Sequence, residues 1–310
     1  MARKVTVSSI CTPPLHVLGS HSSQQIAISL RTYWQQQLEL VLPDQPELIV
    51  LPEKSNVPRG LSSSRERAFC LEYAEEMEQF MCSIAQKSGS YMAYSSIRPM
   101  VDGTWRNSTQ LIDRNGVIIG IYDKNYPTIE EMEDQNIRPG NEVKLMECDF
   151  GTVACGICFD LLFDAHLQRY ADCKPEIIIY SSLMHGGSLA NSWAYSSRAH
   201  LVGAVAGVQS YVISPLGQTI ATSSNYTRYV THTINLDCKV AFWDNNFQKI
   251  KDAKRKYGRG IKVVDPGFQG SILISSESEG LDVNQIIREF KIELIDEYLQ
   301  RSAVTRFQHR

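Results

Sequence analysis

Two short apolar runs constrain the fold of this chain more than any other feature of its sequence. Residues 47–51 read ELIVL and residues 176–181 read EIIIYS. Runs of this length, rich in Ile and Val, are typical of strands that are buried on both faces in an α/β fold. Polar residues follow each run directly, and the ends of such strands are where α/β folds carry their functional side chains.

The segments that contain these runs also resemble each other. Pro46–Glu53 and Pro175–Ser182 share an order of Pro, Glu, apolar strand and polar end. Two halves of this kind would form a pseudo-symmetric sandwich in which both strands deliver functional residues to one rim. Two unrelated buried strands would produce the same similarity, so both interpretations stay open at this point.

Helical and strand patterns alternate along the rest of the chain. Asn115-Gly116 and Phe150-Gly151 each stand between apolar runs, which predicts two hairpins. The predicted helices cover 22–41, 61–87 and 188–202; the predicted strands cover 3–10, 91–97, the hairpin arms 109–113 with 117–122 and 143–149 with 152–157, and pairs within 203–236.

No linker or low-complexity tract divides the sequence, and we therefore expect one α/β domain over residues 1–280. The remaining residues, 281–310, form a C-terminal amphipathic tail with apolar residues on one stripe between 281 and 302. Such a tail packs either on a partner subunit or on the core of its own chain. If it packs on a partner subunit, the protein is a homodimer or larger homo-oligomer.

Composition and charge exclude several classes of protein. No apolar stretch reaches the ~18–20 residues of a transmembrane helix, and the start of the chain has no signal-peptide core. The net charge of −3 and the lack of a long Lys/Arg cluster argue against a nucleic-acid partner. Eight cysteines without a secretory signal are typical of reduced thiols, so we expect a cytoplasmic protein with no membrane contact.

Three segments place a reactive side chain just after a predicted strand. Glu53 follows LIVLP, Lys124 follows GIYD, and Cys158 follows GTVACGI. A carboxylate can serve as a general base, an ammonium can stabilise an oxyanion, and a thiol can serve as a nucleophile. Taken singly, each also has a plainer interpretation as a surface side chain or an inert buried thiol.

The spacing of Cys155 and Cys158 permits a different chemistry, that of a thiol redox pair. A zinc site is not indicated, because no second CxxC or spaced Cys/His pair accompanies it. A redox pair normally opens a helix, whereas Cys155 falls within the apolar run. We therefore interpret Cys155 as a buried bystander and keep a CxxC redox protein as an alternative.

The three segments together resemble the nitrilase superfamily of carbon–nitrogen hydrolases, over about residues 4–245. The motifs that carry the resemblance are Leu51-Pro52-Glu53, Lys124 with Pro127, Thr128 and Glu131, Gly156 to Asp160 around Cys158, and Ser210–Thr219. The resemblance implies a four-layer α-β-β-α sandwich and a Glu53–Lys124–Cys158 triad that needs no metal or other cofactor.

Further site residues follow from the same resemblance. Glu131 corresponds to a second glutamate that orients the substrate and holds Lys124, with its neighbour Glu130 as the alternative. The backbone N–H of Phe159 is expected to help hold an oxyanion. The residues expected to line the substrate pocket are Glu131, Phe159, Tyr126, Ser182, His185 and Trp193.

The residues after the nucleophile indicate the substrate class. Cys158-Phe159-Asp160 is similar to the amidase and carbamoylase branches, so we expect a linear amide or an N-carbamoyl compound. A nitrilase or an acyltransferase using the same triad remains an alternative. Phe159 stands where Trp or Tyr is commoner, and the stretch after Arg198 lacks an asparagine, so the particular substrate is not indicated.

Overall fold

The computed structural model describes residues 2–309, which divide into two compact units. The larger unit spans residues 6–233, and the smaller one combines residues 2–5 with 234–309. The sequence suggested a boundary at residue 280, whereas the contacts of the chain keep 234–309 together. The boundary at 280 stays a prediction.

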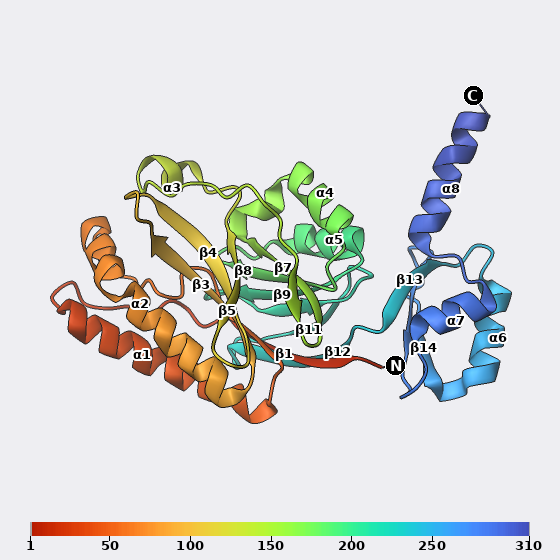
Figure 1. The fold of residues 1–310 in the computed structure, drawn as a ribbon, viewed down its shortest axis with the longest axis horizontal. Helices are drawn as coiled ribbons and strands as arrows, with labels where there is room; N and C mark the ends of the chain where they lie inside the picture. Colours follow the sequence, from red (N-terminus) through yellow and green to blue (C-terminus); the bar gives the residue numbers. More distant parts are fainter. Residues whose placement is uncertain (1, 310) are drawn as a thin grey trace. The chain divides into compact units, whose positions relative to one another are not determined.

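Two six-stranded sheets form the centre of the larger unit (Figure 1). The first has the order β12-β1-β2-β3-β4-β5, with bounds Tyr229–Asn235, Lys4–Ile10, Leu48–Val50, Tyr91–Pro99, Trp105–Ile112 and Ile118–Asp123. The second has the order β11-β10-β9-β8-β7-β6, with bounds Thr219–Thr222, Tyr211–Ile213, His200–Val205, Ile177–Ser182, Gly151–Ile157 and Met146–Cys148.

Helices cover the outer faces of both sheets, which gives the four-layer α-β-β-α sandwich (Figure 1). On the first sheet lie α1 (Ser23–Glu39) and α2 (Ser63–Ser88), which share a hydrophobic core with β2, β3 and β4. On the second lie α4 (Asp164–Cys173) and α5 (Gly187–Ser197), packed on β7, β8 and β9. Burial of these apolar faces is the main stabilising term in such a layered fold.

The two sheets repeat one topology around the two apolar runs. Strand β2 pairs in parallel with β1 and β3, and β8 pairs in parallel with β7 and β9. The hydroxyl of Ser181, on β8, donates to the carbonyl of Leu51, just after β2, over 2.8 Å. The similarity of the two segments therefore marks equivalent central strands, whose ends lie together.

Most predicted elements of the larger unit are present, including both hairpins, β4–β5 and β6–β7. The helix predicted over 188–202 was wrong at its end. Arg198 adopts a left-handed backbone (φ 56°) as the C-cap of α5, and residues 200–205 form the buried strand β9. A left-handed cap stops a helix without a sequence signal when the residue is not Gly or Asn.

The smaller unit is a three-stranded sheet packed against helices. Its sheet has the order β13-β15-β14 (Cys238–Phe242, Ser271–Ser276 and Ile261–Val264), and its helices are α6 (Phe247–Tyr257), α7 (Val283–Phe290) and α8 (Ile295–Gln308). The amphipathic tail is thus two helices, separated after the left-handed Lys291. Over the residues described, no helix combines the length and apolarity needed to cross a bilayer.

Candidate active site

Glu53 lies at the end of the segment that follows β2, and it is 2% exposed. Its Oε1 accepts hydrogen bonds from Lys124 Nζ at 2.9 Å and from Asn107 Nδ2 at 2.8 Å. Its Oε2 accepts the backbone N–H of Leu183 at 3.1 Å. Donors from three separate segments therefore fix the orientation of this carboxylate.

Lys124 follows β5, and its ammonium lies between two carboxylates. Nζ donates to Oε1 of Glu53 at 2.9 Å and to Oε2 of Glu131 at 2.8 Å. Burial disfavours the charged form, but the two carboxylates outweigh burial and raise the pKa of Lys124 above its ordinary value. An ammonium has three protons, so one remains for a further acceptor beside these two.

Glu131 is held by the start of the short helix α3 (Ile129–Glu133). Thr128 and Glu131 form a capping box: Glu131 N–H donates to Thr128 Oγ1, and Thr128 N–H donates to Glu131 Oε2. Burial opposes ionisation of Glu131, yet Lys124 and Lys54 lower its pKa to about 2. The neighbouring Glu130 is exposed, so of the two adjacent glutamates it is Glu131 that lies beside Lys124.

Cys158 is the first residue of a short 3-10 turn, η2 (Cys158–Leu162), directly after β7. Its φ of 46° is left-handed, a conformation that costs a non-glycine residue about 1–3 kcal/mol and is found preferentially at functional sites. Burial and the charge of Glu53 raise the pKa of its thiol to about 11, although Lys124 and hydrogen bonds from Ser182 and Leu183 act in the opposite direction. The resting thiol is therefore protonated at neutral pH.

The backbone N–H of Leu183 connects Cys158 to the Glu53 carboxylate. It donates to Glu53 Oε2, and its hydrogen bond to Cys158 also favours the thiolate. A group that contacts both side chains must lie between them. The thiol, the carboxylate and the ammonium of Lys124 thus form one cluster, which is the arrangement expected of a nucleophile with its base.

Asp160 ties the segment carrying Lys124 to the turn carrying Cys158. Its carboxylate is fully buried and accepts the N–H of Tyr126 at 2.8 Å, the N–H of Ile157 at 2.9 Å and the hydroxyl of Tyr122 at 2.7 Å. Burial raises its pKa to about 6, against the pull of these three donors. Asp160 is therefore mainly ionised at neutral pH and holds the two loops in register.

Two of the residues predicted to line the substrate pocket pack on one aromatic ring. The Tyr126 ring stacks on Phe163 with centroids 3.8 Å apart, and Phe159 meets the same ring edge-on at 5.5 Å. Both side chains are partly exposed. Their contact with a substrate stays a prediction.

Ser182 and His185 lie on the segment that follows β8. Ser182 Oγ donates to the carbonyl of Met184 at 2.6 Å and is also hydrogen-bonded to the Cys158 thiol, which places it beside Cys158. The His185 ring packs against Tyr211 with centroids 5.1 Å apart. Its Nδ1 accepts the N–H of Gly187 at 3.2 Å, which leaves Nε2 as its second polar atom.

Trp193 lies on α5 and is 2% exposed. Its ring contacts Tyr170 at 4.7 Å and His166 at 5.7 Å, measured between ring centroids. These contacts belong to the core between α4, α5 and the second sheet. A role for Trp193 in substrate binding stays a prediction, with packing as its visible function.

Two residues of the cluster were missed by sequence reasoning. Asn107, on β4, donates from one Nδ2 to Oε1 of both Glu53 and Glu131, at 2.8 and 2.9 Å. Lys54 directly follows Glu53, and its Nζ lies 3.0 Å from Oε1 of Glu131. An amide within a strand and a second lysine beside the expected base were the available signals, but neither shows which way a side chain points.

Cys155 lies within β7 and is 1% exposed. Burial raises the pKa of its thiol far above the ordinary value, and both Cys155 and Cys158 are free thiols. A redox cysteine requires a lowered thiol pKa and access to solvent. Among the described residues, no cluster of three or more His, Cys, Asp or Glu side chains is arranged to bind a metal ion.

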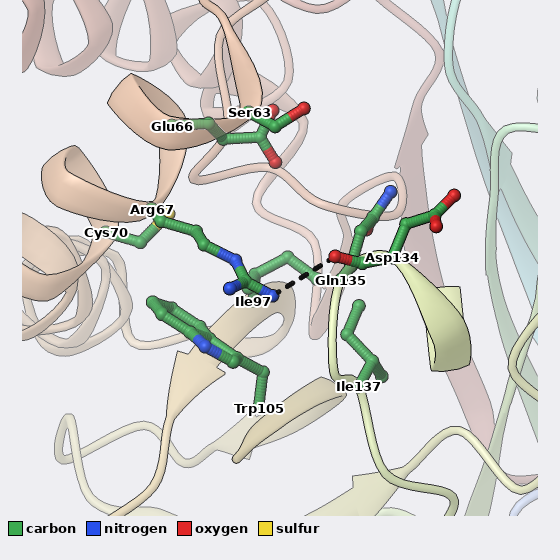
Figure 2. Close-up of a pocket in the computed structure, with 9 residues that line it drawn as sticks. All are labelled: Ser63, Glu66, Arg67, Cys70, Ile97, Trp105, Asp134, Gln135 and Ile137. Carbon is green, nitrogen blue, oxygen red and sulfur yellow. Dashed lines mark hydrogen bonds between the residues drawn. The ribbon is translucent and has the colours of Figure 1, made fainter. Parts of the chain in front are cut away.

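A separate pocket opens at the start of α2 (Figure 2). The Arg67 guanidinium lies over the Trp105 ring at 5.8 Å and donates to the carbonyl of Asp134 at 3.5 Å. Gln135, on the pocket wall, accepts a hydrogen bond from Lys54 Nζ at 3.4 Å. Lys54 therefore connects this pocket to the carboxylate of Glu131.

Comparison with known proteins places these observations in a wider group. The family described as "Carbon-nitrogen hydrolase" matches residues 33–239. Omega-amidase NIT2 of Danio rerio is 26% identical over 218 residues, covering 61% of this chain and 76% of that protein.

Two solved structures share the fold at low sequence identity. Saccharomyces cerevisiae Nit3, a member of branch 10 of the nitrilase superfamily, aligns with a TM-score of 0.58 at 19% identity, covering 75% of this chain and 90% of that one. A variant of the amidase from Nesterenkonia sp. AN1, with the acetamide moiety of fluoroacetamide added covalently at its active-site cysteine, aligns with a TM-score of 0.57 at 15% identity, covering 74% and 89%.

Proposed function

This chain belongs to the carbon–nitrogen hydrolase family, and we propose that it hydrolyses linear amides or N-carbamoyl compounds through a thioester on Cys158. The observation that carries the proposal is the buried ion pair between Lys124 and Glu53, 2.9 Å apart, whose charges both act on the Cys158 thiol. A thiol next to a carboxylate and a cation can be deprotonated at the moment of attack.

The first half of the reaction acylates the enzyme. Glu53 takes the thiol proton as Sγ attacks the carbonyl carbon of the amide. The resulting oxyanion accepts hydrogen bonds from the third Nζ proton of Lys124 and from the Phe159 N–H, which stands in the first turn of η2 where an N–H lacks an intrahelical acceptor. Such donors typically contribute about 3 kcal/mol each to transition-state stabilisation. Glu53 then returns its proton to the nitrogen, the C–N bond breaks, and ammonia or an amine leaves.

The second half releases the acid. A water molecule, deprotonated by Glu53, attacks the thioester carbonyl, and the same two donors hold the second oxyanion. Collapse of this intermediate breaks the C–S bond, and the thiolate of Cys158 recovers the proton from Glu53. Each proton thus passes through one carboxylate, the same one in both steps.

The preference for an amide over a nitrile rests on two supports. Asp160 follows Cys158-Phe159, in the pattern that resembles the amidase and carbamoylase branches. The relative from Danio rerio is named an omega-amidase, and the Nesterenkonia protein is named an amidase. Hydrolysis of nitriles and acyl transfer by the same triad are the competing outcomes of the test below.

The test is release of ammonia from matched panels of short linear amides, N-carbamoyl amino acids and nitriles. We expect release from an amide or carbamoyl compound by the wild type and by Cys155→Ala, and none by Cys158→Ala. Release from nitriles alone would overturn the choice of substrate class. Equal loss in both cysteine variants would overturn the triad and favour the CxxC pair.

We also propose that the protein acts in the cytoplasm as a homodimer or larger homo-oligomer. The eight free thiols support a reducing compartment. Helix α8 exposes Leu299, Val304 and Phe307, at 51%, 52% and 70%, as an apolar surface that a second subunit would cover. Light scattering coupled to size-exclusion chromatography tests the assembly, and a monomer at all concentrations would overturn it.

A further inference from the structure

Lys54 is an unusual residue to find beside a catalytic carboxylate. Its side chain is only 17% exposed, although lysine is almost never buried unless it is paired. Its backbone is left-handed, with a φ of 56°, a conformation that costs a non-glycine residue about 1–3 kcal/mol. This residue therefore occupies a strained, partly buried position directly after Glu53.

The Lys54 ammonium is directed at Glu131. Nζ lies 3.0 Å from Oε1 of Glu131 and 3.4 Å from Oε1 of Gln135, and its charge also acts on the Glu66 carboxylate. Oε1 of Glu131 is shared with Asn107, whereas the opposite oxygen, Oε2, binds Lys124. The two lysines thus hold the two oxygens of one carboxylate.

The charges of the cluster explain what the second lysine does. Glu53 and Glu131 supply two negative charges. With Lys124 as the one cation, the buried cluster would carry an excess of one negative charge. Such an excess would draw Lys124 toward Glu131 and oppose the negative charge that forms on Sγ and on the oxyanion. A second cation on the far oxygen of Glu131 removes that excess.

We propose that Lys54 is a positioning residue whose charge is balanced against Glu131, so that Lys124 stays available to Glu53, Cys158 and the oxyanion. The ammonium of Lys54 contacts Oε1 of Glu131 and Oε1 of Gln135. Because Glu131 also binds Lys124 through Oε2, we place the effect of Lys54 on Lys124 through Glu131. The inference rests on the proposed function only in that Cys158 must react as a thiolate.

The test is the rate at which iodoacetamide alkylates Cys158 at pH 8, measured by mass spectrometry of its peptide. This readout needs no substrate, so it remains interpretable if amide hydrolysis is not found. Lys54→Met is expected to slow alkylation about 3-fold or more, since half a pKa unit on the thiol changes the thiolate fraction by that factor. Lys54→Arg keeps the charge and is expected to restore the wild-type rate.

Three comparisons make the test specific. Lys87→Met removes an equal charge from the exposed last turn of α2 and should leave the rate unchanged. Adding Lys54→Met to Glu131→Gln should have no further effect, because the two residues act together. Lys54→Gln serves as the neutral variant if melting shows that Lys54→Met is unfolded. A wild-type rate in the neutral variant, equal slowing in Lys54→Arg, or full additivity with Glu131→Gln would overturn the proposal.

Discussion

The ammonium of Lys124 lies 2.9 Å from Oε1 of Glu53, and both side chains are 1% exposed. Removing one partner of a buried pair leaves the other charge without compensation, and this typically destabilises a protein by 3–5 kcal/mol. The same pair lies beside Cys158, the proposed nucleophile. Stability and the proposed reactivity therefore depend on the same contacts.

Lys124→Met is expected to lower the free energy of unfolding by about 3–5 kcal/mol, because it leaves Glu53 and Glu131 buried without their shared cation. Lys144→Met is the matched control, since Lys144 is exposed. Urea denaturation of the two variants at pH 7 measures the difference. Equal stability of the two would show that the buried cluster does not stabilise the fold.

The lowered pKa of Glu131 leads us to expect a loss of stability in acid. Its pKa is lowered to about 2, so its contribution is complete above the ordinary value of 4.5 and declines as the pH falls toward 2. The stability difference between the wild type and Glu131→Gln should therefore be about 2 kcal/mol smaller at pH 3 than at pH 6. Urea denaturation at both pH values tests this, and a difference that does not change with pH would contradict it.

Asp160→Asn tests the link between the Lys124 and Cys158 segments. The Asp160 carboxylate accepts hydrogen bonds from three donors, and the amide nitrogen of Asn would face one of them. A buried donor left unsatisfied in this way costs about 1–3 kcal/mol. Tyr122→Phe removes a single donor, and we expect it to destabilise less. Thermal melting of both variants compares them. A more stable Asp160→Asn would mean that Asp160 is not the clamp described here.

We expect the alkylation rate of the Cys158 thiol to depend steeply on pH. Burial and Glu53 raise its pKa to about 11, so the fraction of thiolate should rise about tenfold per pH unit between pH 7 and 10. Iodoacetamide alkylation of wild-type Cys158 measures this fraction, with the buried Cys155, distinguished by fragment ions of the same peptide, as an internal control. A plateau below pH 8 would instead indicate the low-pKa thiol of a redox protein.

The fold could be predicted because two short apolar runs, each recognisable from neighbouring residues alone, mark the central strands of the two sheets. The runs before Glu53 and before Ser182 specify two central strands, and their equivalence specifies two equivalent sheets. The helix expected through residue 202 was wrong because a left-handed Arg198 ends α5, which no local pattern indicates. Helix ends of this kind depend on tertiary contacts.

Only part of the candidate site could be predicted from the sequence, because some of its residues are brought there by tertiary structure. Strand ends indicated Glu53, Lys124 and Cys158, since position along the chain is enough to place a residue at a rim. Asn107 and Lys54 could not be recognised, because their roles depend on the direction of a side chain across two or more segments. The direction of a side chain follows from backbone geometry, such as the positive φ of Lys54, and cannot be inferred from residue type alone.

The central claim is that Cys158 carries the acyl group of an amide as a thioester. Acid quenching during turnover of the amide that releases ammonia fastest, followed by peptide mass spectrometry, measures it most directly. We expect a mass increase equal to the acyl group on the peptide containing Cys158, absent in Cys158→Ala and retained in Cys155→Ala. An acyl group on another residue, or ammonia release that persists in Cys158→Ala, would contradict it.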